Sequence, residues 1–96
     1  MTGKERAYWR AQANHLEPLF QVGKGGMSDA LIKQTDDALR ARELIKVTVL
    51  ETSPMKAREC ADTVAEATNS DVVQVIGSRF ILYKESKNNK TIKLVK

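Results

Sequence analysis

Apolar positions recur along the chain with two different spacings, and each spacing predicts a different kind of element. Near the N-terminus they follow helical spacing, at Trp9, Ala13 and Leu16. Thr2 and Glu5 match the capping-box pattern, which predicts that this helix begins near Gly3. Pro18 is expected to end it, because the residue before a proline disfavours the helical conformation. The apolar stretch over residues 19–22 then predicts a short strand.

A second helix and a second strand follow. Ser28 is a suitable N-cap, and the bases at Arg40–Arg42 suit the negative end of the helix. The predicted inner face of this helix comprises Leu31, Thr35, Ala38 and Leu39. Over residues 44–50 the spacing changes to alternation, with apolar side chains at Ile45, Val47 and Val49. Lys46 and Thr48 lie between them, so we expect a strand with one apolar face and one mixed face.

A third helix is predicted to start at Ser53-Pro54, with the serine as cap and the proline in its first turn. Its apolar stripe comprises Ala57, Cys60, Ala61, Val64, Ala65 and Thr68. Cys60 lies on that stripe, so we interpret it as a small buried apolar side chain. Asn69-Ser70 is expected to end the helix.

Two strands over residues 72–76 and 79–83 complete the pattern, joined by Gly77-Ser78, a suitable two-residue hairpin turn. The sequence therefore predicts a compact single α/β domain in the order α-β-α-β-α-β-β. Its three helices cover a small mixed four-stranded sheet. We place the domain at residues 1–85 and a basic C-terminal tail at residues 86–96, with Thr91–Val95 as a candidate edge strand.

The formal net charge is +4, but it is unevenly distributed over the 96 residues. Residues 79–96 hold six bases and one acid, and residues 1–28 also carry a positive excess. Residues 29–78 hold six bases and nine acids. Basic ends favour an anionic partner. A lysine-rich end can also serve solubility alone, and the sequence leaves both interpretations open.

Catalysis, metal binding and membrane insertion find little support. Cys60 and His15 are the only residues of their types, so no disulfide and no thiolate or histidine metal cluster is predicted. Asp36 and Asp37 are adjacent on a helix and point in different directions. There is no signal-peptide pattern and no apolar run of the roughly 20 residues that a membrane helix needs. We expect a cytoplasmic protein without cofactor, metal or small-molecule substrate.

The strongest candidate for function is the loop formed by Gly23, Lys24, Gly25 and Gly26, between a predicted strand and a predicted helix. Glycine lets a backbone approach another molecule closely, and the helix that follows offers unpaired amides. Lys24 adds a charge, so the loop could hold a phosphate or a nucleic-acid backbone. Its G-x-x-G pattern resembles KH modules, which clamp nucleic-acid backbones, although theirs lies between two helices. A plain turn is the alternative.

The chain as a whole resembles the CRM domain family (chloroplast RNA splicing and ribosome maturation), in its stand-alone bacterial, YhbY-like form. Four stretches carry the resemblance in order, namely 9–18, Val22–Gly26, Arg42–Val47 and Val73–Gly77 with Ile81–Lys84. Trp9 replaces the usual leucine, and Arg42 stands where histidine is common. The resemblance implies a fold similar to the C-terminal domain of translation initiation factor three. It also implies RNA binding without catalysis, with large-subunit ribosomal RNA or its precursor as the expected partner.

The resemblance transfers the G-x-x-G loop to residues 23–26. From their positions, we also expect Arg6, Arg10 and Lys46 to extend a basic surface toward RNA. No cluster of exposed aromatic side chains is predicted, which argues against a base-stacking platform. A second hypothesis is a protein-interaction module that docks on a ribosomal or assembly protein. In that case the acidic middle would meet a basic partner through Asp29, Asp36, Asp37 and Glu43.

Overall fold

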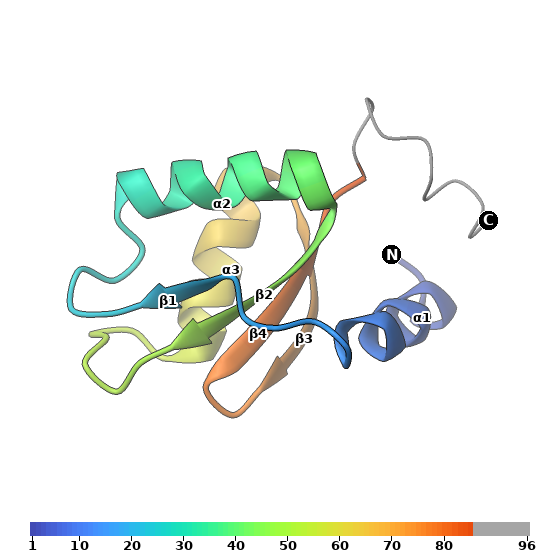
Figure 1. Ribbon diagram of the computed structural model, residues 1–96, viewed down its shortest axis with the longest axis horizontal. Coiled ribbons are helices and arrows are strands. Elements are labelled where there is room, and N and C mark those ends of the chain that lie inside the picture. The colour runs from blue at the N-terminus through green and yellow to red at the C-terminus, as the bar shows by residue number, and fades with distance from the viewer. Residues whose placement is uncertain (86–96) are drawn as a thin grey trace.

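The computed structural model describes residues 1–85, which form three helices and a four-stranded sheet (Figure 1). The elements are α1 (Gly3–Ala13), β1 (Phe20–Val22), α2 (Asp29–Arg42), β2 (Leu44–Val49), α3 (Ala57–Thr68), β3 (Asp71–Ile76) and β4 (Arg79–Tyr83). The predicted fold class and element order are confirmed. The tail over residues 86–96, with its candidate edge strand, lies outside the described residues.

The start of α1 is as predicted, but its end is not. The Thr2 hydroxyl accepts from the Glu5 amide at 3.1 Å, and the Thr2 amide donates to the Glu5 carboxylate at 3.0 Å. The helix ends at Ala13, well before Pro18. The amides of residues 15 and 16 donate to carbonyls three residues back, so the last turn tightens and the chain leaves the helix. The Leu19 amide then donates to the Lys46 carbonyl at 2.8 Å, which fixes this segment to the sheet.

Local sequence signals predict the start of α2 correctly but not the start of α3. Ser28 caps α2 by accepting from the Leu31 amide at 3.2 Å, as expected. α3 starts at Ala57 rather than at Ser53-Pro54. The Ser53 hydroxyl instead bonds both the amide and the carbonyl of Met55, at 3.1 and 2.7 Å, and so stabilises a turn before the helix.

The sheet is mixed, with the strand order β1-β2-β4-β3. β1 pairs parallel with β2, while β4 pairs antiparallel with both β2 and β3. Gly77 has a φ of +56°, which its place in the hairpin turn requires and which glycine adopts without strain. The register shifts between Val72 and Gln74, marking an irregularity in the edge strand β3.

Two apolar clusters pack on opposite faces of this sheet. The larger lies beneath α2 and α3 and takes every second residue of β2, at Ile45, Val47 and Val49. All six predicted stripe residues of α3 are buried in the structure, including Cys60. On the other face α1 packs through Trp9, whose ring stacks on Tyr83 with centroids 4.3 Å apart. α1 lies toward one end of the sheet, so the helix itself covers only part of this face (Figure 1).

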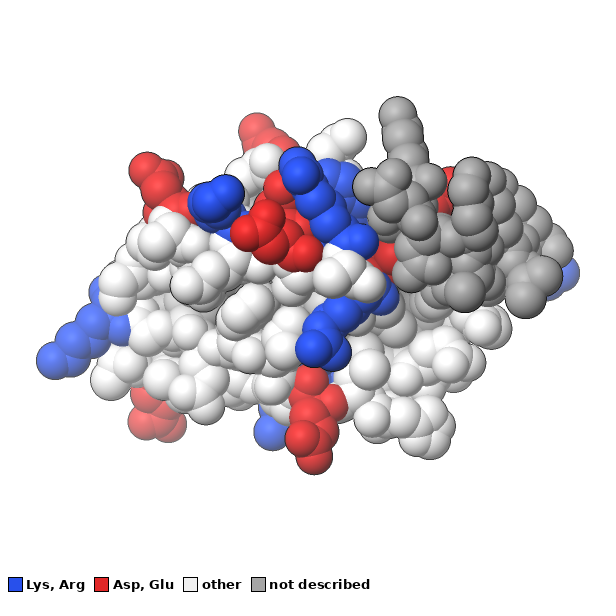
Figure 2. Space-filling view, turned by 45° about the horizontal axis from the view of Figure 1, so that its top comes forward, with Lys and Arg blue, Asp and Glu red and all other residues white. Residues whose placement is uncertain are grey.

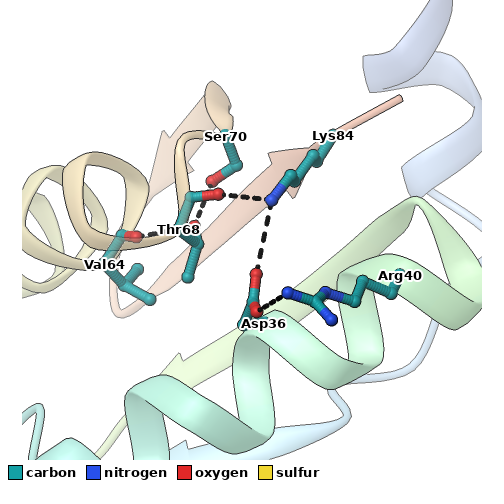
Figure 3. A network of polar contacts seen from close by, with 6 residues as sticks. All are labelled: Asp36, Arg40, Val64, Thr68, Ser70 and Lys84. Atoms are coloured by element: carbon teal, nitrogen blue, oxygen red, sulfur yellow. Dashed lines mark hydrogen bonds and ion pairs between the residues drawn. The ribbon is translucent and has the colours of Figure 1, made fainter. Parts of the chain in front are cut away.

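A polar network joins α2, the end of α3 and β4 (Figure 3). The Lys84 ammonium donates to the Thr68 carbonyl at 2.8 Å and lies 3.4 Å from the Asp36 carboxylate. Asp36 also pairs with Arg40 at 3.1 Å. Lys84 is one of the six bases of residues 79–96, for which the sequence leaves both an anionic partner and a role in solubility open. The structure shows that it pairs with a partly buried carboxylate and binds the C-terminus of a helix.

Candidate nucleic-acid interface

A tight turn joins β1 to α2 and contains the four residues of the predicted loop. The Gly26 amide donates to the Gly23 carbonyl at 2.9 Å and closes the turn. Lys24 and Gly25 lie at its tip, and both are exposed. The predicted strand-to-helix placement of the loop is therefore confirmed, with its lysine directed away from the core.

The glycines of this turn serve different purposes. Gly26 is buried with a φ of +60°, and a Cβ atom there would lie 3.4 Å from the Pro54 ring, so the fold itself favours glycine. Gly25 has no such internal reason. A Cβ atom at Gly25 would meet no described atom within 4 Å, and its φ is not positive. The missing side chain at Gly25 leaves the outer surface of the turn open to close approach by another molecule.

The start of α2 lies directly behind this turn. The first amides of a helix have no partner within the helix itself. Here the Ser28 hydroxyl accepts a hydrogen bond from one of them, the Leu31 amide. These first amides give this end a partial positive charge. Asp29, in the first turn, is an exposed acid that counters part of that charge. An approaching anion is therefore best placed at the tip of the loop, beside Lys24 and the Gly25 backbone.

The predicted basic residues do not form one continuous surface with the loop. Arg6 and Arg10 are exposed on α1, which lies at the opposite end of the molecule from the turn between β1 and α2 (Figure 1). They can meet the same ligand only if that ligand spans the domain. Sequence spacing places both arginines on one helix face, but it says nothing of how far that helix lies from the loop.

Lys46 lies on the sheet face that α1 covers only in part. It is half-buried and lines a hollow of about 310 Å³ beside the β3–β4 turn, together with Asn14 and Arg79. A second hollow of about 780 Å³ adjoins β1 and is lined by Gln21, Thr48 and again Arg79. The sequence alone does not distinguish Arg79 from the other bases of residues 79–96. Its alternation with Ile81 along the strand could have placed it on the outer face, but not opposite Thr48.

The acidic surface expected for a protein partner is smaller than predicted. Glu43 is fully buried at the end of α2, with a φ of 66°, so it cannot meet a partner. Asp36 is engaged by Arg40 and Lys84. On the side of the molecule where α2 lies, acidic and basic side chains are interspersed rather than gathered by sign (Figure 2). Of the four acids predicted to meet a basic partner, Asp29 and Asp37 are exposed.

A comparison with known protein families decides the relationship. The model of the CRS1 / YhbY (CRM) domain matches residues 1–84. The chain belongs to the CRM domain family. The resemblance inferred from the four sequence stretches is thereby confirmed.

Individual relatives show the same relationship over most of the chain. The chain is 49% identical to "Probable RNA-binding protein YqeI" of Bacillus subtilis, over 98% of each chain. It is 40% identical to "Probable RNA-binding protein MJ0652" of Methanocaldococcus jannaschii, over 88% of this chain and 63% of that protein. The solution structure of the hypothetical protein SAV1595 from Staphylococcus aureus matches with a TM-score of 0.79. Its sequence is 51% identical, over 94% of each chain.

Three further features of the CRM domain concern chemistry other than RNA binding, namely Cys60, metal ligands and membrane contact. Burial raises the pKa of the Cys60 thiol, as expected of a core residue. Within residues 1–85, no three His, Cys, Asp or Glu side chains gather in a way that could hold a metal ion. In the same part of the chain, no helix combines the length and apolar character needed to cross a membrane.

Proposed function

We propose that this protein binds RNA without catalysing a reaction, and that the Gly23–Gly26 loop contacts the RNA backbone. The observation that carries the proposal is the turn itself. Lys24 stands exposed at its tip, next to a glycine that the fold does not require. A phosphate can approach the backbone there without meeting a side chain, and Lys24 neutralises its charge. The printed names of two relatives, "Probable RNA-binding protein YqeI" and "Probable RNA-binding protein MJ0652", support the same proposal.

Backbone contacts should dominate over base contacts. Among the phenylalanine, tryptophan and tyrosine side chains, all of which lie within residues 1–85, only that of Tyr8 is exposed. Trp9, Phe80 and Tyr83 are buried, so the domain offers no row of aromatic rings for stacking successive bases. We therefore expect recognition of RNA shape and backbone rather than of a sequence.

We further propose that the RNA is large-subunit ribosomal RNA or its precursor, bound in the cytoplasm during subunit assembly. This part rests on the family resemblance seen in the sequence. Ultraviolet crosslinking in cells, followed by sequencing of the attached RNA, tests it. Enrichment of large-subunit fragments over their share of cellular RNA is the expected result. Crosslinks spread in proportion to RNA abundance would contradict the assembly role.

The same experiment separates RNA binding from the protein-docking alternative. A protein that docks on an assembly factor through Asp29 and Asp37 should yield few direct RNA crosslinks, although it travels with ribosomal particles. The Asp29→Asn/Asp37→Asn variant should then lose its association with these particles. If the protein binds RNA directly, the same variant should associate with the particles at least as strongly as wild type, because removing two acids lowers repulsion toward phosphate.

A further inference from the structure

One row of side chains crosses the open part of the sheet face. Gln21 of β1 lies opposite Thr48 of β2, and Thr48 lies opposite Arg79 of β4. On the far side Arg79 lies opposite Ile76 of β3. Residues directly opposite one another on neighbouring strands point to the same face. The register alone therefore aligns one residue from each of the four strands.

This row is accessible. Gln21 and Arg79 are exposed, Thr48 is half-buried, and 55% of the Ile76 surface is exposed. The two hollows described above lie along the row and share Arg79 as a lining residue. Because Arg79 lines both, the two hollows are adjacent, and we refer to them together as the trough, which extends from β1 toward the β3–β4 turn. The trough has Arg79 in its middle and Lys46 in its second hollow.

The charge of the trough favours an anionic occupant. Neither Lys46 nor Arg79 forms an ion pair with any described residue, whereas Lys84, Arg40 and Arg58 all do. Glu17 lines the β1 end of the trough and is the one acid among the residues that line the two hollows. Two cations without a protein partner against one acid leave a net positive surface.

The trough also continues the proposed loop contact. Gln21 stands two residues before Gly23, so the row begins about 7 Å along the chain from the loop. From Gln21 to Arg79 the row crosses two strand spacings, about 10 Å. Both distances are short enough for one RNA strand that leaves the loop to reach Arg79.

We propose that this trough is a second RNA-backbone site, in which Arg79 is the principal phosphate contact and Lys46 a further one. The inference rests on the proposed function, because the RNA strand held at Lys24 is the strand that continues into the trough. Arg79 can offer its planar guanidinium to two phosphate oxygens, with Gln21 and Thr48 as neutral hydrogen-bonding neighbours. Ile76 offers an apolar edge against sugar or base.

Binding of purified large-subunit ribosomal RNA by the full chain tests the trough. Arg79→Gln should lower affinity about sixfold at 0.1 M salt and reduce the log–log salt slope by about one contact. Arg40→Gln is the matched control, since it removes the same charge from the exposed side of α2 and should leave affinity nearly unchanged. Gln21→Glu, which changes charge but hardly shape, should also weaken binding.

The outcomes separate this inference from the proposed function. Wild-type affinity in both Arg79→Gln and Gln21→Glu, with weakened binding in Lys24→Ala, would overturn the trough and leave the loop intact. No measurable binding by the wild-type chain would overturn both. An equal loss of RNA affinity in Arg79→Gln and Arg40→Gln would mean that only the net charge of the protein determines binding, and would also overturn the trough. Unchanged thermal unfolding of Arg79→Gln is expected, because its side chain is exposed.

Discussion

Replacing Lys84 with methionine should destabilise the fold without weakening RNA binding. Methionine keeps much of the aliphatic stem but removes the ammonium, which donates to the Thr68 carbonyl at 2.8 Å and lies 3.4 Å from Asp36. A hydrogen bond with one charged partner contributes about 1.5–3 kcal/mol. The ion pair adds only on the order of 0.2–1 kcal/mol, because about a quarter of each side chain is exposed and solvent screens the charges.

We therefore expect Lys84→Met to lower the free energy of unfolding by about 2 kcal/mol, which corresponds to roughly 8–16 °C in Tm for a domain of this size. Urea denaturation followed by circular dichroism measures the change, and the slope m should stay constant. Arg40→Gln is the control. Its side chain is 70% exposed, so the loss of its ion pair with Asp36 should cost at most about 0.5 kcal/mol.

Two results would refute this reasoning. If Lys84→Met unfolds within about 0.5 kcal/mol of wild type, the ammonium does not stabilise the junction of α2, α3 and β4. If Lys84→Met binds RNA several times more weakly while its fold is intact, Lys84 belongs to the interface rather than to the interior network. The variant thus separates a structural cation from the binding cations Lys24 and Arg79.

Three further predictions follow from the packing of the domain. Gly26→Ala should cost about 1–2 kcal/mol in urea denaturation because its φ is +60°, whereas Gly25→Ala should be close to neutral; equal costs would contradict the turn geometry. Trp9→Ala should cost about 3–5 kcal/mol, as expected for a buried tryptophan stacked on Tyr83, and a cost below about 1 kcal/mol would mean that α1 hardly holds to the sheet. Burial, with nearby carboxylates, raises the pKa of Tyr83 from 10 to about 12. The stability that this shift contributes is complete below pH 10 and is lost between pH 10 and 12, so Tyr83→Phe should flatten that fall; parallel pH profiles would contradict it.

The parts of the fold that depend on local chemistry were predictable from the sequence. Thr2 with Glu5, and Ser28, cap their helices because the hydroxyl and the amide it accepts from are three residues apart. Ser53 was misleading for a physical reason. Its hydroxyl can satisfy either a helix amide or a nearby turn, and here it binds Met55 in a turn that packs beside Gly26. That choice depends on a contact between two loops that are distant in sequence.

The same distinction between local signals and long-range contacts applies to the candidate site. The loop was visible because its four residues are contiguous, and the outward face of Lys46 was visible because strands alternate. Arg79 could not be identified from the sequence alone, since its place beside Thr48 depends on the pairing of residues that are 31 positions apart. The internal role of Lys84 was hidden because its partner Asp36 lies 48 residues away. Charge patterning gives the sign of a side chain, but tertiary contacts decide whether that charge is free to meet a ligand.

The salt dependence of RNA binding by wild type and Lys24→Ala tests the central claim most directly. Affinity for purified large-subunit ribosomal RNA would be measured at several salt concentrations between 50 and 200 mM. Each phosphate contact should give a log–log slope of roughly −0.7 to −0.9, or about a threefold loss over this range. Lys24→Ala should bind more weakly and with a slope smaller by about one contact. A flat wild-type response, or identical slopes for the two proteins, would contradict a loop that binds the RNA backbone.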